Sequence, residues 1–167
     1  PLIVPQKYFD MYPLEDIRLA NILENDKDDT FLHLVDQFET RGRRVRSIEM
    51  YKNLIDSYDD NKEGLKRFTQ AYLACVTAVD ENIGQVLSAV NKTKLKDNTI
   101  VIIASDHGWT MGEKEHIYKN SLWEESTRVP LIIRAPGISK PNTKVNHPVS
   151  LIDVSPTLLD LAGLDFI

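Results

Sequence analysis

The sequence contains little cysteine, no long hydrophobic run and no excess of basic residues. Its 167 residues include one cysteine, Cys75, so an internal disulfide is excluded. No apolar run approaches the roughly 18 to 20 residues that a membrane-spanning helix requires. The net charge is −5, which gives no reason to expect nucleic acid or an anionic membrane as a partner. These absences leave the cellular compartment open.

Helix and strand patterns alternate in the second half of the chain. Apolar residues recur at three- and four-residue steps over 64–90, which predicts a long amphipathic helix. Residues 99–104 and 129–134 are short apolar runs rich in β-branched side chains, which is typical of strands buried on both faces. This order predicts an α/β fold with a partial doubly wound, mostly parallel sheet that helices flank.

Three shorter helices are predicted beside these elements. The first covers residues 46–58 and the second residues 121–127. The last has Ser155 as its N-cap and Pro156 in its first position, and it ends at Gly163.

We interpret residues 1–167 as one partial domain. An irregular peripheral segment is expected at 1–43, because prolines and an acidic run at 24–29 interrupt it. The α/β core portion is expected at 44–167. Residues 41–46 form the one basic cluster, which either lines a pocket for an anionic saccharide or is a solvated turn and helix start.

The polar segment between the two predicted strands is the candidate functional site. Asp106, His107 and Gly108 follow the strand at 99–104, and ligands of α/β sheets gather at the carboxyl ends of strands. Carboxylate oxygens and imidazole nitrogens bind metals, while glycine allows a tight turn. In the structural alternative, Asp106 caps the next turn and His107 bonds locally. The length and charge of 105–120 favour a functional loop.

Two further residues of this loop carry chemistry. His116 has an unperturbed pKa of about 6.5, so it could protonate a leaving alkoxide as a catalytic acid; the alternative is a surface histidine without a task. Lys119, taken by its spacing alone, is a solvated surface lysine. Trp109 is expected to pack beneath the loop, and Arg128 to pair with Glu124 or Glu125 at helical spacing.

The residues of this region occur in a family order. Ser105-Asp106-His107-Gly108, then Gly112-Glu113, then Lys119, and then the run from Trp123 to Ile133 resemble the second signature region of the type I sulfatases, in the alkaline phosphatase superfamily. The Asp-His form is similar to iduronate-2-sulfatase-like and choline-sulfatase-like members. Residues 1–13 and 150–164 resemble other family segments, so the resemblance covers nearly the whole chain as the C-terminal part of a catalytic domain.

This resemblance implies a metal-dependent sulfuric ester hydrolase. Asp106 would bind a divalent cation, usually calcium, with magnesium or manganese as alternatives, and His107 would bind the metal or the sulfate. Lys119 would contact a sulfate oxygen and offset charge that develops during cleavage. The implied substrate is a sulfated small molecule or saccharide.

Two family features do not occur in the chain. One is a Cys/Ser-x-Pro-x-Arg motif, whose first residue is converted to the formylglycine that attacks sulfur; Cys75 is followed instead by Val-Thr-Ala. The other is an early strand that ends in an Asp-Asp pair of metal ligands. We therefore expect a sulfatase as the parent protein, formylglycine in a missing N-terminal part, and an inactive 167-residue chain.

Two alternatives remain open at this point. The parent protein could be a phosphonate or phosphate ester hydrolase of the same superfamily, since such enzymes reuse Asp-His-Gly. The chain could also be a non-catalytic remnant that acts as a binding module. An exposed sheet edge could in addition drive formation of a homo-oligomer, because unpaired strand groups take up partners.

Overall fold

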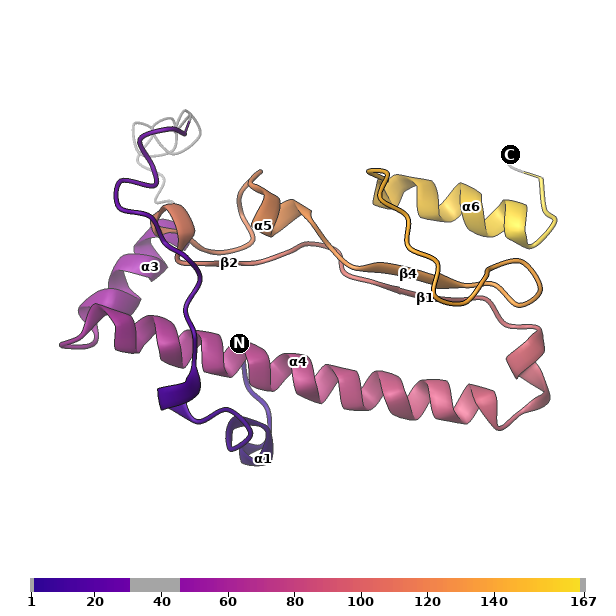
Figure 1. The fold of residues 1–167 in the computed structure, drawn as a ribbon, viewed down its shortest axis with the longest axis horizontal. Coiled ribbons are helices and arrows are strands. Elements are labelled where there is room, and N and C mark those ends of the chain that lie inside the picture. The colour runs from indigo at the N-terminus through magenta and orange to yellow at the C-terminus, as the bar shows by residue number, and fades with distance from the viewer. Residues whose placement is uncertain (1, 31–45, 166–167) are drawn as a thin grey trace. The chain divides into compact units, whose positions relative to one another are not determined.

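The computed structural model describes residues 2–30 and 46–165 (Figure 1). They form two compact units. One combines the chain up to Leu87 with His107–Arg128, and the other combines Ser88–Asp106 with the chain from Val129 onward. The basic cluster at 41–46, apart from the backbone of Arg46, and residues 31–43 of the expected peripheral segment lie outside the described residues.

The first unit is mostly helical. The predicted helix at 46–58 is confirmed as α3, and the one at 64–90 as α4, which is longer at its start. The helix expected at 121–127 forms only over its last turn. The elements are α1 (Gln6–Phe9), the 3-10 helix η1 (Leu14–Asp16), α3 (Arg46–Asp56), α4 (Asn61–Asn91), β2 (Thr110–Met111), the 3-10 helix η3 (Glu113–Glu115), β3 (Ile117–Tyr118) and α5 (Glu124–Thr127).

The N-terminal segment packs along α4, as Figure 1 shows for the indigo part of the chain. Tyr8 Oη donates to Glu81 Oε2 at 2.7 Å, and the hydroxyls of Tyr12 and Thr77 lie 2.6 Å apart. The beginning of the segment expected to be irregular and peripheral is therefore anchored by polar contacts and by a small apolar cluster. This cluster consists of Tyr8, Ala74 and Ala78, with Val4 and Phe9 packed against it.

The second unit contains a two-stranded sheet. Its strands pair antiparallel, with Val101 opposite Arg134 and Ala104 opposite Leu131. Strands β2 and β3 of the first unit are antiparallel as well. The elements of the second unit, besides the end of α4, are the 3-10 helix η2 (Lys94–Asp97), β1 (Val101–Ala104), β4 (Leu131–Arg134), the 3-10 helix η4 (Leu151–Asp153) and α6 (Val154–Leu161).

The prediction of a mostly parallel sheet is wrong for the described residues. A parallel connection usually runs through a crossover helix, whereas residues 105–130 between β1 and β4 form the β2–β3 hairpin and the short α5 (Glu124–Thr127). The chain therefore leaves the end of β1 and returns into the neighbouring strand. Apolar runs predict that strands form but not their direction. Burial on both faces is not seen either, since Ile132 is 58% exposed.

The last helix begins earlier than predicted. Val154 is its first residue, so Ser155 is not the N-cap, and Pro156 fits because first-turn N–H groups have no intrahelical acceptor. Ser150 caps the preceding 3-10 helix η4 (Leu151–Asp153), which leads directly into α6. Its Oγ accepts the N–H of Ile152 at 3.4 Å, and its own N–H donates to the Asp153 carboxylate at 3.3 Å. Gly163, at φ 68°, ends the helix as predicted.

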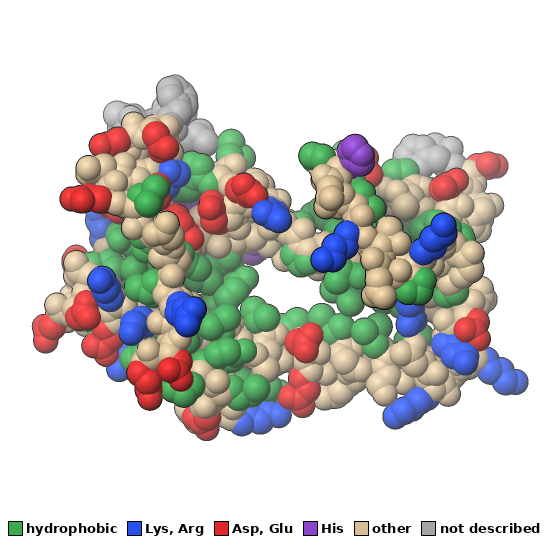
Figure 2. Space-filling model, viewed as in Figure 1, with side chains coloured by type: hydrophobic (Ala, Val, Ile, Leu, Met, Phe, Trp, Pro, Cys, Tyr) green, Lys and Arg blue, Asp and Glu red, His purple; other side chains and the backbone are tan. Residues whose placement is uncertain are grey.

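The surface carries interspersed acidic and basic side chains, and hydrophobic side chains also reach it over α4 (Figure 2). On α4, the side chains of Val76, Val79 and Val86 are 47, 55 and 64% exposed. Within the described ranges, no helix combines the length and apolar character needed to span a bilayer.

Candidate functional site

The segment between β1 and β4 folds into a compact hairpin of β2 and β3. Gly112 turns the chain at φ 118°, a conformation that side chains disfavour, and an added Cβ would lie 2.9 Å from Ile22 Cδ1. The charged sequence that predicted a functional loop therefore builds a small core of its own. The least exposed side chains of this core are Thr110, His116 and Ile117, at 0, 2 and 2% exposure.

Gly108 lies directly against the backbone of α5. Its N–H donates to the Ser126 carbonyl at 2.7 Å, and the N–H of Trp109 donates to the Glu125 carbonyl at 2.6 Å. A Cβ on Gly108 would lie 2.0 Å from the Glu125 carbonyl oxygen. Glycine is therefore required by this close approach, and the segment after His107 is held firmly on α5.

His107 and Lys119 meet across the hairpin. Lys119 Nζ lies 2.8 Å from His107 Nε2, and His107 Nδ1 lies 2.8 Å from the Gly108 carbonyl oxygen. A carbonyl only accepts, so Nδ1 carries the hydrogen and Nε2 presents its lone pair to the ammonium. Metal-binding histidines are commonly oriented by such a bond from their other ring nitrogen. The structure thus brings two of the predicted site residues together.

Aromatic rings pack around His107 and around Tyr118, the residue before Lys119. Trp109 packs against Tyr118 with ring centroids 4.9 Å apart and against His107 at 6.1 Å. On the α4 side, the centroids of Phe68 and Tyr72 lie 6.3 and 5.7 Å from that of Trp109. The packing role expected for Trp109 is confirmed, and the ring cluster fixes both His107 and the residue before Lys119.

His116 points into the hairpin core, where it is 2% exposed. Its Nδ1 lies 2.8 Å from Thr110 Oγ1, and its ring meets Trp123 edge to face at 5.4 Å. Its buried Nε2 has no hydrogen-bond partner within the described part of the chain. Burial lowers the pKa of this imidazole more than the backbone of Asn120 raises it. The neutral ring is therefore favoured near pH 7.

Asp106 is exposed and precedes His107 in the sequence. The two side chains are a carboxylate and an imidazole, both suitable for a divalent cation. Calcium prefers six or more oxygen ligands, however, and the residues described in the structure contain no group of three or more His, Cys, Asp or Glu that could hold a metal ion. Ligands from these two residues alone would leave such a coordination sphere incomplete.

The acidic segment 24–29 anchors the hairpin, which sequence reasoning missed. Lys114 Nζ lies 2.9 Å from Asp26 Oδ1, and the Lys114 N–H donates to Asp26 Oδ2 at 3.0 Å. The hydrogen bond from Lys114 lowers the pKa of the Asp26 carboxyl more than burial raises it. Lys27 pairs with Glu115 next to this contact. The opposite charges of the two segments were visible in the sequence, but the pairing was not.

Two other contacts of the loop are local. Arg128 Nη1 lies 2.9 Å from Glu124 Oε1, which confirms the predicted pairing at helical spacing. The Glu113 carboxylate accepts the N–H of Met111 at 2.6 Å and so caps the hairpin turn.

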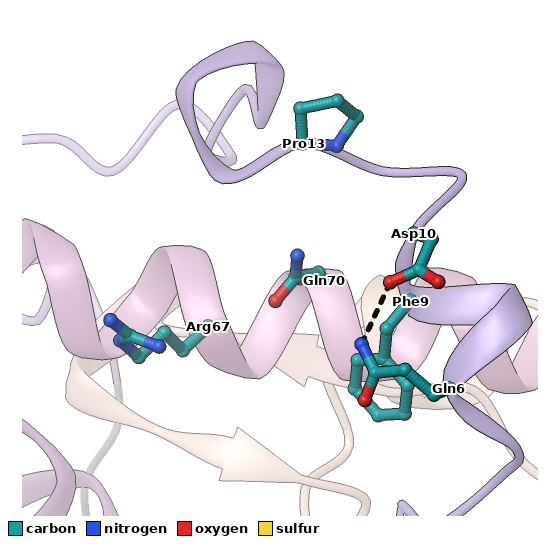
Figure 3. Close-up of a pocket in the computed structure, with 6 residues that line it drawn as sticks. All are labelled: Gln6, Phe9, Asp10, Pro13, Arg67 and Gln70. Carbon is teal, nitrogen blue, oxygen red and sulfur yellow. Dashed lines mark hydrogen bonds between the residues drawn. The ribbon is translucent and has the colours of Figure 1, made fainter.

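Two pockets lie away from the predicted site residues. The first, of about 670 Å³, lies between the N-terminal segment and α4 (Figure 3). Gln6 and Asp10 are hydrogen-bonded to each other at its edge, at 2.8 Å. The second, of about 590 Å³, lies beside β4 in the second unit. Neither is lined by Asp106, His107, His116 or Lys119. The first pocket is lined by Gln6, Phe9, Asp10, Pro13, Arg67 and Gln70.

The sulfatase family model matches residues 6–164, and the chain therefore belongs to the sulfatase family. It is 37% identical to a sulfatase of Formosa agariphila over 98% of its length and 30% of the relative. It is 32% identical to the choline-sulfatase of Rhizobium meliloti over 98% of its length and 29% of the relative. The chain thus spans about a third of the length of these relatives.

Solved structures show the same fold over the same partial length. The phosphonate monoester hydrolase of Silicibacter pomeroyi matches with a TM-score of 0.78 and 29% identity, over 99% of this chain and 32% of that one. A protein solved in complex with its substrate, D-glucosamine-2-N, 6-O-disulfate, matches with a TM-score of 0.61 and 32% identity, over 79% of this chain and 26% of that one. The fold is that of part of a sulfatase or phosphonate hydrolase.

Proposed function

We propose that this chain supplies metal- and sulfate-binding residues of a metal-dependent sulfatase that hydrolyses sulfate esters. Asp106 and His107 bind a divalent cation, with calcium as the first candidate and magnesium or manganese as the others. Lys119, together with His107, contacts oxygen atoms of the sulfate group. The observation that supports this proposal is the 2.8 Å approach of Lys119 Nζ to His107 Nε2, because it gathers an ammonium and a metal-binding nitrogen at one point.

The two side chains divide the task by their chemistry. The lone pair of His107 Nε2 suits a cation, and a cation held there would supply Lewis-acid chemistry at the sulfate ester. The Lys119 ammonium donates to an anion without a fixed geometry, and it can therefore follow the sulfate oxygens as their charge grows. With a cation on His107, the ammonium would turn from the imidazole to the anion beside it.

Other parts of the chemistry are assigned outside these residues. The further oxygen ligands of the cation and the formylglycine nucleophile are proposed to come from segments that this chain does not include, since the chain spans 30% of its Formosa relative. The role of His116 as the catalytic acid remains a prediction. Its 2% exposure argues against that role, because a proton donor must reach the leaving oxygen directly or through one water.

The proposed substrate is a sulfated small molecule or saccharide. The similarity to a protein solved with a disulfated glucosamine supports a saccharide, and the similarity to choline-sulfatase supports a small alcohol. Phosphonate or phosphate ester hydrolysis is the second candidate function, because a phosphonate monoester hydrolase matches the structure with a TM-score of 0.78.

The test is an assay of the complete gene product after chelation and addition of calcium, magnesium or manganese. We expect metal-dependent release from 4-nitrophenyl sulfate that exceeds release from a 4-nitrophenyl phosphonate ester, and no release by the 167-residue chain alone. Lys119→Ala should lower kcat/KM by about 100- to 1000-fold, whereas Lys140→Ala, beside the second pocket, should not. Faster phosphonate cleavage would favour the second candidate, and no turnover of either ester would favour a binding module.

A further inference from the structure

The hairpin core contains a series of hydrogen bonds that ends at Tyr118, the residue before Lys119. Thr110 Oγ1 lies 2.6 Å from the Tyr118 carbonyl oxygen and 2.8 Å from His116 Nδ1. Thr110 is fully buried and His116 is 2% exposed, so water does not compete for these bonds. These hydrogen bonds therefore connect the imidazole of His116, through the Thr110 hydroxyl, to the peptide group that precedes Lys119.

The direction of each bond follows from counting hydrogens. A threonine hydroxyl has one hydrogen, and the Tyr118 carbonyl can only accept. If Thr110 donates to that carbonyl, its oxygen must accept from His116, so His116 carries its hydrogen on Nδ1. In the opposite tautomer, with the hydrogen on Nε2, Nδ1 would compete with the Tyr118 carbonyl for the single hydroxyl hydrogen.

Tyr118 has a backbone conformation that needs such support. Its φ is 75°, a region that is unfavourable for a bulky residue and persists only where the surroundings enforce it. The Tyr118 ring is held by Trp109 at 4.9 Å and by Phe68 at 5.6 Å, while its carbonyl is held by Thr110. The turn at Tyr118 sets the direction in which Lys119 leaves β3.

We propose that His116 and Thr110 are positioning residues for Lys119. His116 Nδ1 donates to Thr110 Oγ1, Thr110 donates to the Tyr118 carbonyl, and the peptide so fixed directs the Lys119 ammonium to the point beside His107 where the anion binds. This inference rests on the proposed function in that Lys119 is taken to bind the sulfate group. It gives His116 a task that needs no access to the substrate.

The first test is the tautomer of His116 in the complete gene product, read from the ring ¹⁵N chemical shifts by NMR. We expect hydrogen on Nδ1, and loss of that pattern in Thr110→Val but not in Thr110→Ser, which keeps the hydroxyl. Hydrogen on Nε2 would overturn the proposal. This measurement needs no turnover, so it judges the series of hydrogen bonds even if the protein proves not to be a sulfatase.

The second test is a double-mutant cycle between Thr110 and Lys119 with a sulfate ester as substrate. Thr110→Val should lower kcat/KM by about tenfold, and Thr110→Ser should restore most of it. In the Lys119→Ala background, Thr110→Val should have no further effect, because the group that it positions is gone. An equal loss in both backgrounds would assign Thr110 a structural role only.

His116 variants complete the test. His116→Asn can donate to Thr110 from its amide and should retain more activity than His116→Leu, at equal thermal stability. Equal activity of the two variants would contradict the proposal. If both variants lose proton transfer to the leaving group, His116 would instead be assigned as the catalytic acid.

Discussion

The hairpin of β2 and β3 and the strand pair of β1 and β4 differ in how they are stabilised. The strands β1 and β4 are apolar, yet Ile132 is 58% exposed, whereas the hairpin is rich in charge and buries Thr110 completely. The hairpin gains its core from specific polar contacts, such as those of Asp26 with Lys114 and of Gly108 with α5. Hydrophobicity along the sequence is thus a poor guide to which of the two regions is the better packed.

The largest expected effect on stability separates these regions directly. Ile117 is 2% exposed in the hairpin and Ile132 is 58% exposed in β4. Ile117→Ala should reduce the free energy of unfolding by about 2 to 5 kcal/mol, because it leaves a cavity. Ile132→Ala should change it by about 0.5 kcal/mol or less. Urea unfolding measures both, and equal losses would contradict the difference in packing.

Two glycine-to-alanine substitutions test whether close backbone packing is specific to the hairpin region. Gly108→Ala places a Cβ 2.0 Å from the Glu125 carbonyl oxygen, and overpacking of this kind costs about 1 to 3 kcal/mol. Gly84 lies within α4 with nothing near its Cβ position, so Gly84→Ala should stabilise by about 0.5 to 1 kcal/mol. Thermal unfolding of both variants checks the opposite signs, and a stabilised Gly108→Ala protein would show that the close approach does not exist.

The acidic anchor can be tested with a matched pair of aspartates. Asp26→Asn weakens the contact with Lys114, whose side chain is 18% exposed, while Asp28 is exposed. We expect faster amide hydrogen exchange in the hairpin of Asp26→Asn, because local opening becomes easier, and no change in Asp28→Asn. The same exchange rates in the two variants would mean that the hairpin holds without the anchor.

The smallest expected effect is a pH dependence from His116. Burial lowers the pKa of this imidazole in the folded state, so below about 6.5 the unfolded chain binds the proton more readily. The free energy of unfolding should therefore fall as the pH decreases below that value. His116→Asn should remove this part of the slope, as urea unfolding at several pH values would show; an unchanged slope would mean that the ring is not held neutral.

Parts of this account were predictable from the sequence. The long helix, the two apolar strands and the pairing of Arg128 with Glu124 follow from local periodicity and spacing, and so does the loop that carries His107 and Lys119. Strand direction did not follow, because an apolar run looks the same in either direction. The buried position of His116 and the contact of Asp26 with Lys114 depend on residues far apart in the sequence, which spacing does not reveal.

The most direct test of the central claim is a titration of the calcium-loaded complete gene product with inorganic sulfate, followed by NMR of the His107 ring and the Lys119 Nζ, with chloride at equal ionic strength as control. The account predicts that both signals shift together with one dissociation constant, because the two groups lie 2.8 Å apart and face the same anion. Shifts in only one group, or in neither at saturating sulfate, would contradict it.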